Sequence, residues 1–137
     1  MTVIISNDVL KSLSDYKKSL INYPISRQRA LEKYNKMVDS LQNLGNYHSQ
    51  CRPCVHKKLG QEFDSDGIPL FKDLYRFNYK DESNFQWAFA IIIDEQNDTI
   101  TITKMMPSIF VTENNHIISK IVIETVNNYL IRNLLLY

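Results

Sequence analysis

The spacing of apolar residues changes partway along the chain, from a helical period to an alternating one. In the first third of the chain they recur every three or four positions, which predicts two amphipathic helices. From residue 71 to residue 105 they alternate with polar residues or run continuously, which predicts β-strands. A chain that carries the two patterns in separate segments is expected to fold as an α+β protein.

The helical part is predicted to form an antiparallel hairpin after a first strand at Thr2–Ile5. Ser6 or Asn7 is the expected cap of the first helix, Pro24 separates the two helices, and Ser26 is the expected cap of the second. The predicted buried faces are Val9, Leu13, Tyr16 and Leu20 in the first helix, and Leu31, Tyr34, Met37, Val38, Leu41 and Leu44 in the second.

A long hydrophilic loop over residues 46–69 separates the hairpin from three predicted strands in an antiparallel meander. The strands are expected at Phe71–Tyr79, Phe85–Ile93 and Thr99–Met105. An additional C-terminal helix is predicted over residues 114–137, where it docks on the sheet or offers an apolar patch to a partner. Residues 1–137 are thus expected to form one domain, a helical hairpin packed on a small antiparallel sheet in the order β-α-α-β-β-β-α.

The charge is close to neutral overall but is unevenly distributed. The formal net charge is +1, yet residues 9–58 carry ten Lys/Arg against three Asp/Glu. This asymmetry indicates a basic face for nucleic acid or an acidic partner, or only the usual preference of helix surfaces for lysine. We expect a cytoplasmic protein without a signal peptide or cofactor. A membrane span is not expected either, because no apolar run approaches the about 20 residues of a transmembrane helix.

The sheet segments carry a resemblance to a known family. Lys57-Lys58-Leu59-Gly60 precedes Leu74-Tyr75-Arg76-Phe77, an aromatic and aliphatic segment follows at Trp87–Asp94, and the β-branched segment Ile100–Lys104 comes last. With the element order, this pattern resembles the RelE/ParE toxin superfamily over roughly residues 2–105. Members of that superfamily are mostly toxins of toxin–antitoxin pairs, and the RelE-like ones cleave mRNA on the ribosome.

The resemblance implies a set of site residues and partners. Basic side chains would stabilise the phosphate during attack by the ribose 2′-OH. Arg76 would clamp that phosphate, Arg52 and Lys72 would bind RNA, and the expected partners are a cognate antitoxin and RNA or the ribosome. The catalytic residues implied by the resemblance are Lys57, Lys58, Arg76, Lys104 and, on the terminal helix, Tyr129.

A local cluster of His48, Cys51, Cys54 and His56 permits a different interpretation. A CxxC pair flanked by histidines is a set of side chains that zinc accepts, although structural zinc sites usually take a second ligand pair from a distant segment. The cysteines could also be a redox pair or two unrelated thiols. A zinc-dependent nucleic-acid-binding domain is therefore one further hypothesis.

A non-catalytic binding protein on the same fold is the main alternative function. Met105-Met106-Pro107-Ser108 follows Lys104, where many RelE-like ribonucleases have an arginine or a His-Tyr pair. With the near-neutral charge, this favours a gyrase-type inhibitor, or a regulatory module that contacts its partner through the terminal helix.

Overall fold

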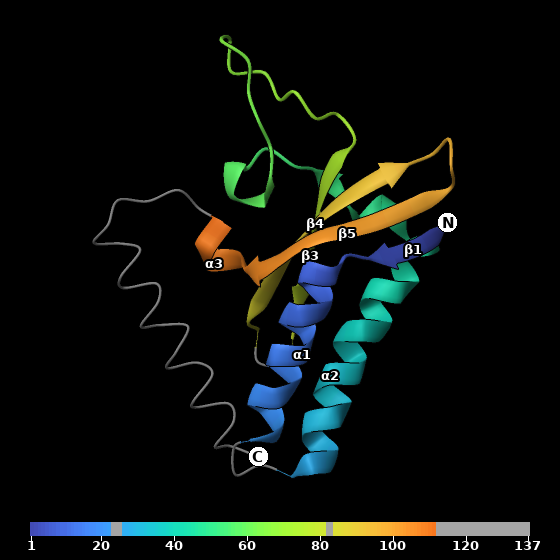
Figure 1. Cartoon of the computed structure of the whole chain (residues 1–137), viewed down its shortest axis with the longest axis vertical. Helices are drawn as coiled ribbons and strands as arrows, with labels where there is room; N and C mark the ends of the chain where they lie inside the picture. The colour runs from blue at the N-terminus through green and yellow to red at the C-terminus, as the bar shows by residue number, and fades with distance from the viewer. Residues whose placement is uncertain (23–25, 82–83, 112–137) are drawn as a thin grey trace, which may run out of the picture.

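The computed structural model describes residues 1–22, 26–81 and 84–111 of the chain, and it has an α+β fold. Two N-terminal helices pack on a five-stranded mixed sheet with the strand order β1-β5-β4-β3-β2 (Figure 1). The helical C-terminal segment predicted over residues 114–137, which includes Tyr129, lies outside the described residues. The main elements are β1 (Thr2–Ile5), α1 (Asn7–Ile21), α2 (Arg27–Gln42), β2 (Arg52–Pro53), β3 (Leu74–Lys80), β4 (Gln86–Asp94), β5 (Thr99–Pro107) and α3 (Ser108–Val111).

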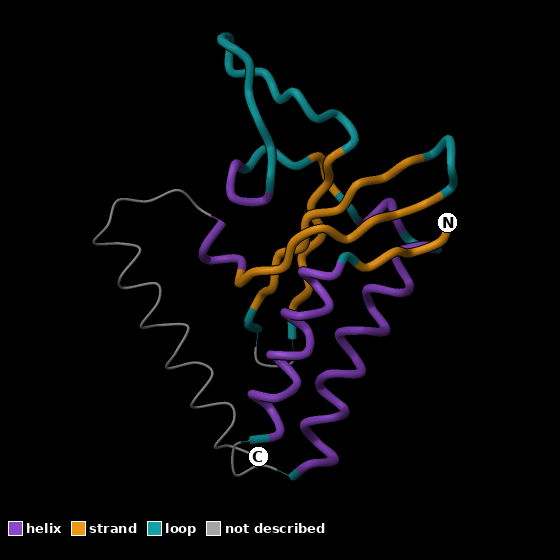
Figure 2. Tube along the Cα trace, viewed as in Figure 1, coloured by secondary structure: helices purple, strands orange, loops and turns teal. Residues whose placement is uncertain are grey.

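The helical hairpin is confirmed, and α1 buries the face that was predicted for it. Ser6 caps α1, because its Oγ accepts a hydrogen bond of 3.3 Å from the backbone N–H of Val9. The antiparallel arrangement of α1 and α2 is visible in Figure 2. The buried residues of α1 are Val9, Leu13, Tyr16 and Leu20.

The buried face of α2 differs in part from the prediction. Leu31, Tyr34 and Val38 are only half-buried, because they lie on the flank of the helix beside the row that faces the core. The Tyr34 ring instead lies under the ammonium group of Lys17 on α1, with its centroid 5.0 Å from Nζ. The buried row consists of Ala30, Lys33, Met37 and Leu41, and Leu44 continues it just beyond the helix.

The predicted meander is confirmed for β3, β4 and β5, which pair antiparallel in that order. The first of these strands starts later than expected: Phe71 lies before β3 and is exposed, whereas Tyr75, Phe77 and Tyr79 do face the helices. The pairing of β4 with β5 shifts register between Ala90 and Ile91, as in a β-bulge.

The sheet is mixed, not purely antiparallel as predicted. β1 pairs in parallel with β5, and the helical hairpin provides the start of the long connection that parallel pairing needs. At the opposite edge, Arg52 and Pro53 form β2, which pairs antiparallel with Arg76 and Tyr75. Two residues of the predicted loop thus belong to the sheet.

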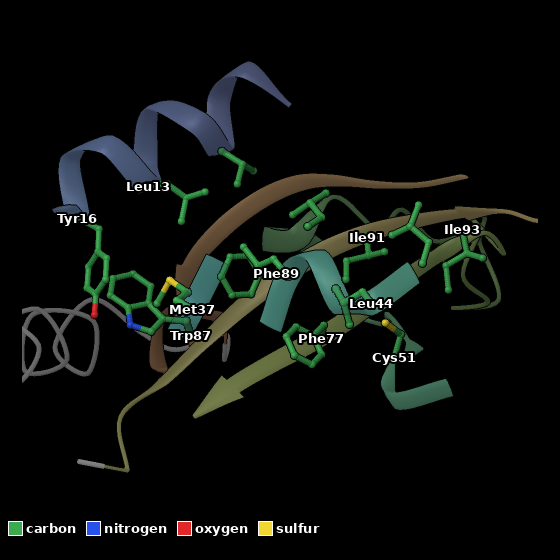
Figure 3. Close-up of a cluster of buried hydrophobic side chains, with 14 of the residues drawn as sticks. Leu13, Tyr16, Met37, Leu44, Cys51, Phe77, Trp87, Phe89, Ile91 and Ile93 are labelled. Carbon is green, nitrogen blue, oxygen red and sulfur yellow. The ribbon is translucent and has the colours of Figure 1, made fainter. Parts of the chain in front are cut away.

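The sheet has a hydrophobic cluster on each face. Figure 3 shows the larger one, in which Phe89 and Ile91 of β4 lie between the helices and the sheet. At one end of this cluster, the Trp87 ring makes an edge contact with Tyr16 at a centroid distance of 5.3 Å. The smaller cluster, on the opposite face, consists of Cys54, Leu59, Leu74, Ala88, Ala90 and Val111. In the described part of the chain, none of the helices has the length and apolarity needed to cross a membrane.

Candidate anion-binding groove

The loop predicted over residues 46–69 is held in place by buried groups. It contains two short 3-10 turns, η2 (His48–Gln50) and η3 (Lys57–Leu59), on either side of β2. The side chain of Gln61 is 3% exposed. Its amide N–H groups donate to the carbonyl oxygens of Cys54 and Phe71, both at 2.8 Å. Its oxygen accepts from the N–H groups of Glu62 and Phe71 at 3.1 and 2.9 Å. These four bonds use the full hydrogen-bonding capacity of an amide, so this part of the loop is fixed against β3.

The register of β2 places Arg52 directly opposite Arg76. Side chains of directly opposed residues lie on the same face of a sheet, with Cβ atoms about 5 Å apart. The row continues through Ala90, which is opposite Arg76 on β4, to Lys104, which is opposite Ala90 on β5. Three basic residues expected at the site, far apart in the sequence, therefore share one row on the face away from the helices.

A groove of ≈ 520 Å³ lies at the β2 end of this row. It opens where the chain before Arg52 leaves the sheet as η2, so that β2 covers only part of the outer edge of β3. Within the described residues, no carboxylate lines this groove. Its lining is Gln50, Arg52, Pro53, His56, Arg76, Phe77 and Asn78.

Arg76 is the more restrained of the two arginines. Its Nε–H donates a 2.8 Å hydrogen bond to Oδ1 of Asn78, two residues along β3 on the same face. Partial burial lowers the pKa of Arg76, and the neighbouring Cys54 offsets this in part. A guanidinium stays protonated at neutral pH despite such a shift, and four of its five N–H donors are not used by the bond to Asn78.

Lys104 belongs to the same row but does not line the groove. Ala90 separates it from Arg76 and is fully buried together with Leu59 of η3. The side chain of Lys104 extends toward Gly60 instead: a Cβ built on that glycine would lie 3.9 Å from Nζ. The lysine is therefore a neighbour of the groove, on the other side of a small apolar barrier.

The remaining basic candidates are exposed and lie outside the groove lining. Leu59 is buried and anchors η3, and because a 3-10 turn has three residues, Lys57 and Lys58 point in other directions. Lys72 precedes β3 and is exposed. The structure thus brings together Arg52 and Arg76, with Lys104 nearby, and does not bring Lys57, Lys58 or Lys72 to the same groove.

The predicted cluster of His48, Cys51, Cys54 and His56 is divided by the sheet. Cys51 belongs to the helix-side cluster and Cys54 to the cluster on the opposite face, and both thiols are free. His48 is exposed on η2. In the ranges that the structure describes, no three His, Cys, Asp or Glu side chains are grouped to hold a metal ion. The four residues therefore do not form one ligand set here.

His56, Gln50 and Asn78 were not predicted as parts of an anion site. The sequence does single out His56, but as a zinc ligand, because its neighbours along the chain include two cysteines. Its place beside Arg76 depends on the pairing of β2 with β3, and a two-residue strand leaves no periodic signal.

Comparison of the chain with protein-family models, with curated proteins and with solved structures gives no match.

Proposed function

We propose that this protein is an endoribonuclease of the RelE type, the toxin of a toxin–antitoxin pair, which cleaves mRNA on the ribosome. The observation that carries the proposal is the direct opposition of Arg52 and Arg76 at a groove without a carboxylate among its described lining residues. Like charges on directly opposed residues of two strands repel each other, and an anion bound between the two side chains would relieve that repulsion.

A phosphodiester is the anion that fits this arrangement best. Guanidinium groups present planar pairs of N–H donors that match phosphate oxygens, and two of them can contact one phosphate from different sides. Gln50 and Asn78 add amide groups suited to ribose hydroxyls or base edges. A segment of single-stranded RNA offers all of these groups, with bases that are not paired.

The groove would accelerate cleavage by stabilising the negative charge that develops on the phosphate. When the ribose 2′-oxygen attacks phosphorus, the bond from phosphorus to the 5′-oxygen breaks, leaving a 2′,3′-cyclic phosphate and a 5′-hydroxyl. The phosphate gains negative charge in the transition state, so Arg52 and Arg76 would stabilise that state more strongly than the substrate. Lys104, in the same row, is the next cation available to the RNA strand.

The resemblance to the RelE/ParE superfamily supports the same conclusion from the sequence side. The order of strand, helical hairpin and antiparallel meander is the order on which the resemblance rests. Arg76 and Lys104, which match basic positions of the family pattern, lie in one row of the sheet. On this proposal the partners are a cognate antitoxin and the ribosome.

Induced expression in a bacterial host tests the proposal. We expect the wild-type protein to stop growth with rapid loss of translation and with new 5′ ends in mRNA. Arg76→Ala should lower the cleavage rate about 10²-fold and relieve the arrest, because one preorganised donor to the transition state is removed. Lys11→Ala is the control, since it removes an exposed cation on α1, outside the groove, and should leave the arrest unchanged.

Other outcomes would point elsewhere. Filamentation with continued translation would support a gyrase-type inhibitor. A wild-type protein without effect on growth, translation or RNA would refute the toxin proposal. The second candidate is then a non-catalytic binding module. The apolar side chains of Val55, Ile68 and Leu70 favour it, because each is about half-exposed on the long loop or directly after it.

A further inference from the structure

We propose that His56 is the general base of the cleavage reaction, a role that rests on the proposed ribonuclease function. It lines the groove together with Arg52 and Arg76, and it lies just after β2, as the residue directly before η3. The groove thereby combines groups that bind a phosphate with a group that can take a proton.

The backbone of His56 is held in place by hydrogen bonds to its carbonyl oxygen. Its carbonyl oxygen accepts hydrogen bonds from the N–H groups of Leu59 and Gln61, both at 3.2 Å. The same oxygen accepts a weak bond from the Cys54 thiol at 3.8 Å. Leu59 and Gln61 are both buried, so His56 is attached to the sheet on its C-terminal side. A base in a ribonuclease must be held in this way, because proton transfer needs hydrogen-bond reach of the 2′-OH.

Of the described side chains that line the groove, His56 is the one suited to proton transfer near pH 7. Among the described residues that line the groove, the amides of Gln50 and Asn78 do not titrate, and a guanidinium group offers donors but no acceptor for a proton. Imidazole is the side chain that exchanges a proton between about pH 5 and 8. A neutral imidazole accepts the proton of a hydroxyl, which none of the other lining groups does near pH 7.

His56 takes the proton from the ribose 2′-OH while the 2′-oxygen forms its bond to phosphorus, and the departing 5′-oxygen takes a proton from water. In the described part of the chain, the charged residues that share the groove with His56 are Arg52 on β2 and Arg76 on β3, and Lys57 and Lys58 follow it on η3. Arg52 and Arg76 bind the phosphate, and the imidazole removes the proton.

The test is single-turnover cleavage of mRNA on programmed ribosomes between about pH 5.5 and 8.5, with purified full-length protein. For the wild type, the rate should rise with pH as imidazole loses its proton and then level off. His56→Gln should lower the rate about 10²- to 10⁴-fold and abolish this rise, while RNA binding is retained. His48→Gln is the matched control, because it changes an exposed histidine outside the groove and should preserve rate and profile.

A second variant separates a chemical role from a structural one. His56→Ala should regain activity when free imidazole is added, which a variant with a merely damaged loop would not do. If His56→Gln cleaves with the wild-type pH profile, or is slower but keeps that profile, the assignment of His56 is wrong and the ribonuclease proposal stands. If the wild-type protein does not cleave RNA at all, the proposed function itself fails and this inference fails with it.

Discussion

At the scale of single residues, Cys51 and Cys54 show how a short strand separates neighbours in the sequence. They flank Arg52 and Pro53, which form β2, so their side chains fall on opposite faces of the sheet. The same alternation puts Cys54 on the face of Arg52, where it lies close enough to affect the pKa of Arg76. The CxxC spacing therefore reflects two separate cores and not a paired site.

The Cys51 thiol is expected to be unreactive in the folded protein. Burial raises its pKa from 9.0 to about 11, so at pH 8 only about one thiol in a thousand is ionised. In a Cys54→Ser variant, modification by a disulfide reagent should be slow at pH 8, accelerate as the pH approaches 11, and become fast in denaturant. Because the folded state holds this proton more tightly, its contribution to stability is complete below about pH 9 and is lost as the pH rises toward 11. Rapid modification of the native variant at pH 8 would contradict the burial of Cys51.

At the scale of elements, the sequence predicts those parts whose signal is local. The two helices and the three meander strands were predicted because their apolar residues repeat at 3.6 or 2 positions over many residues. β2 and the parallel pairing of β1 with β5 depend on contacts between distant segments. The spacing of apolar residues along the sequence does not predict such contacts. For the same reason Arg76 and Arg52 could be proposed separately as phosphate ligands, whereas their opposition across two strands, and His56 beside them, could not.

The two helix starts provide a comparison of capping residues. Ser6 accepts a hydrogen bond from Val9, and its hydroxyl also donates to the carbonyl oxygen of Thr103 on β5 at 3.4 Å. Ser26 occupies the equivalent position before α2 but makes no capping bond with its side chain. Ser6→Ala should therefore lower the free energy of unfolding by about 1 kcal/mol, and Ser26→Ala by no more than a few tenths. Urea denaturation of both variants checks this, and equal losses would show that the cap of α1 is not formed as described.

At the scale of the whole molecule, the two faces of the sheet differ in what they carry. The face that packs on α1 and α2 holds the larger cluster, with Phe89 and Ile91 fully buried (Figure 3). The opposite face has a smaller apolar cluster, and the row from Arg52 to Lys104 runs across it. The face toward the helices thus forms most of the core, and the opposite face carries like-charged residues in one row, which disfavours the fold electrostatically.

On the proposed function, the like-charged pair that binds RNA should lower the stability of the fold. Arg52→Glu replaces a like-charged pair with an opposite-charged one across β2 and β3, so it should raise the free energy of unfolding by about 0.5 kcal/mol at low salt. The same change places a carboxylate where the phosphate is expected, so RNA affinity should fall sharply. Thermal unfolding and RNA binding, measured on one preparation at two salt concentrations, check both effects.

Two controls separate the possible causes of such a result. Arg52→Gln removes the repulsion without adding attraction, so its stability should fall between wild type and Arg52→Glu. Lys11→Glu makes the same change in net charge on an exposed position of α1 and should affect RNA binding little. If Arg52→Glu were less stable than wild type and still bound RNA, Arg52 would not be opposed to Arg76 at an anion site. The row of cations would then not be a phosphate-binding site.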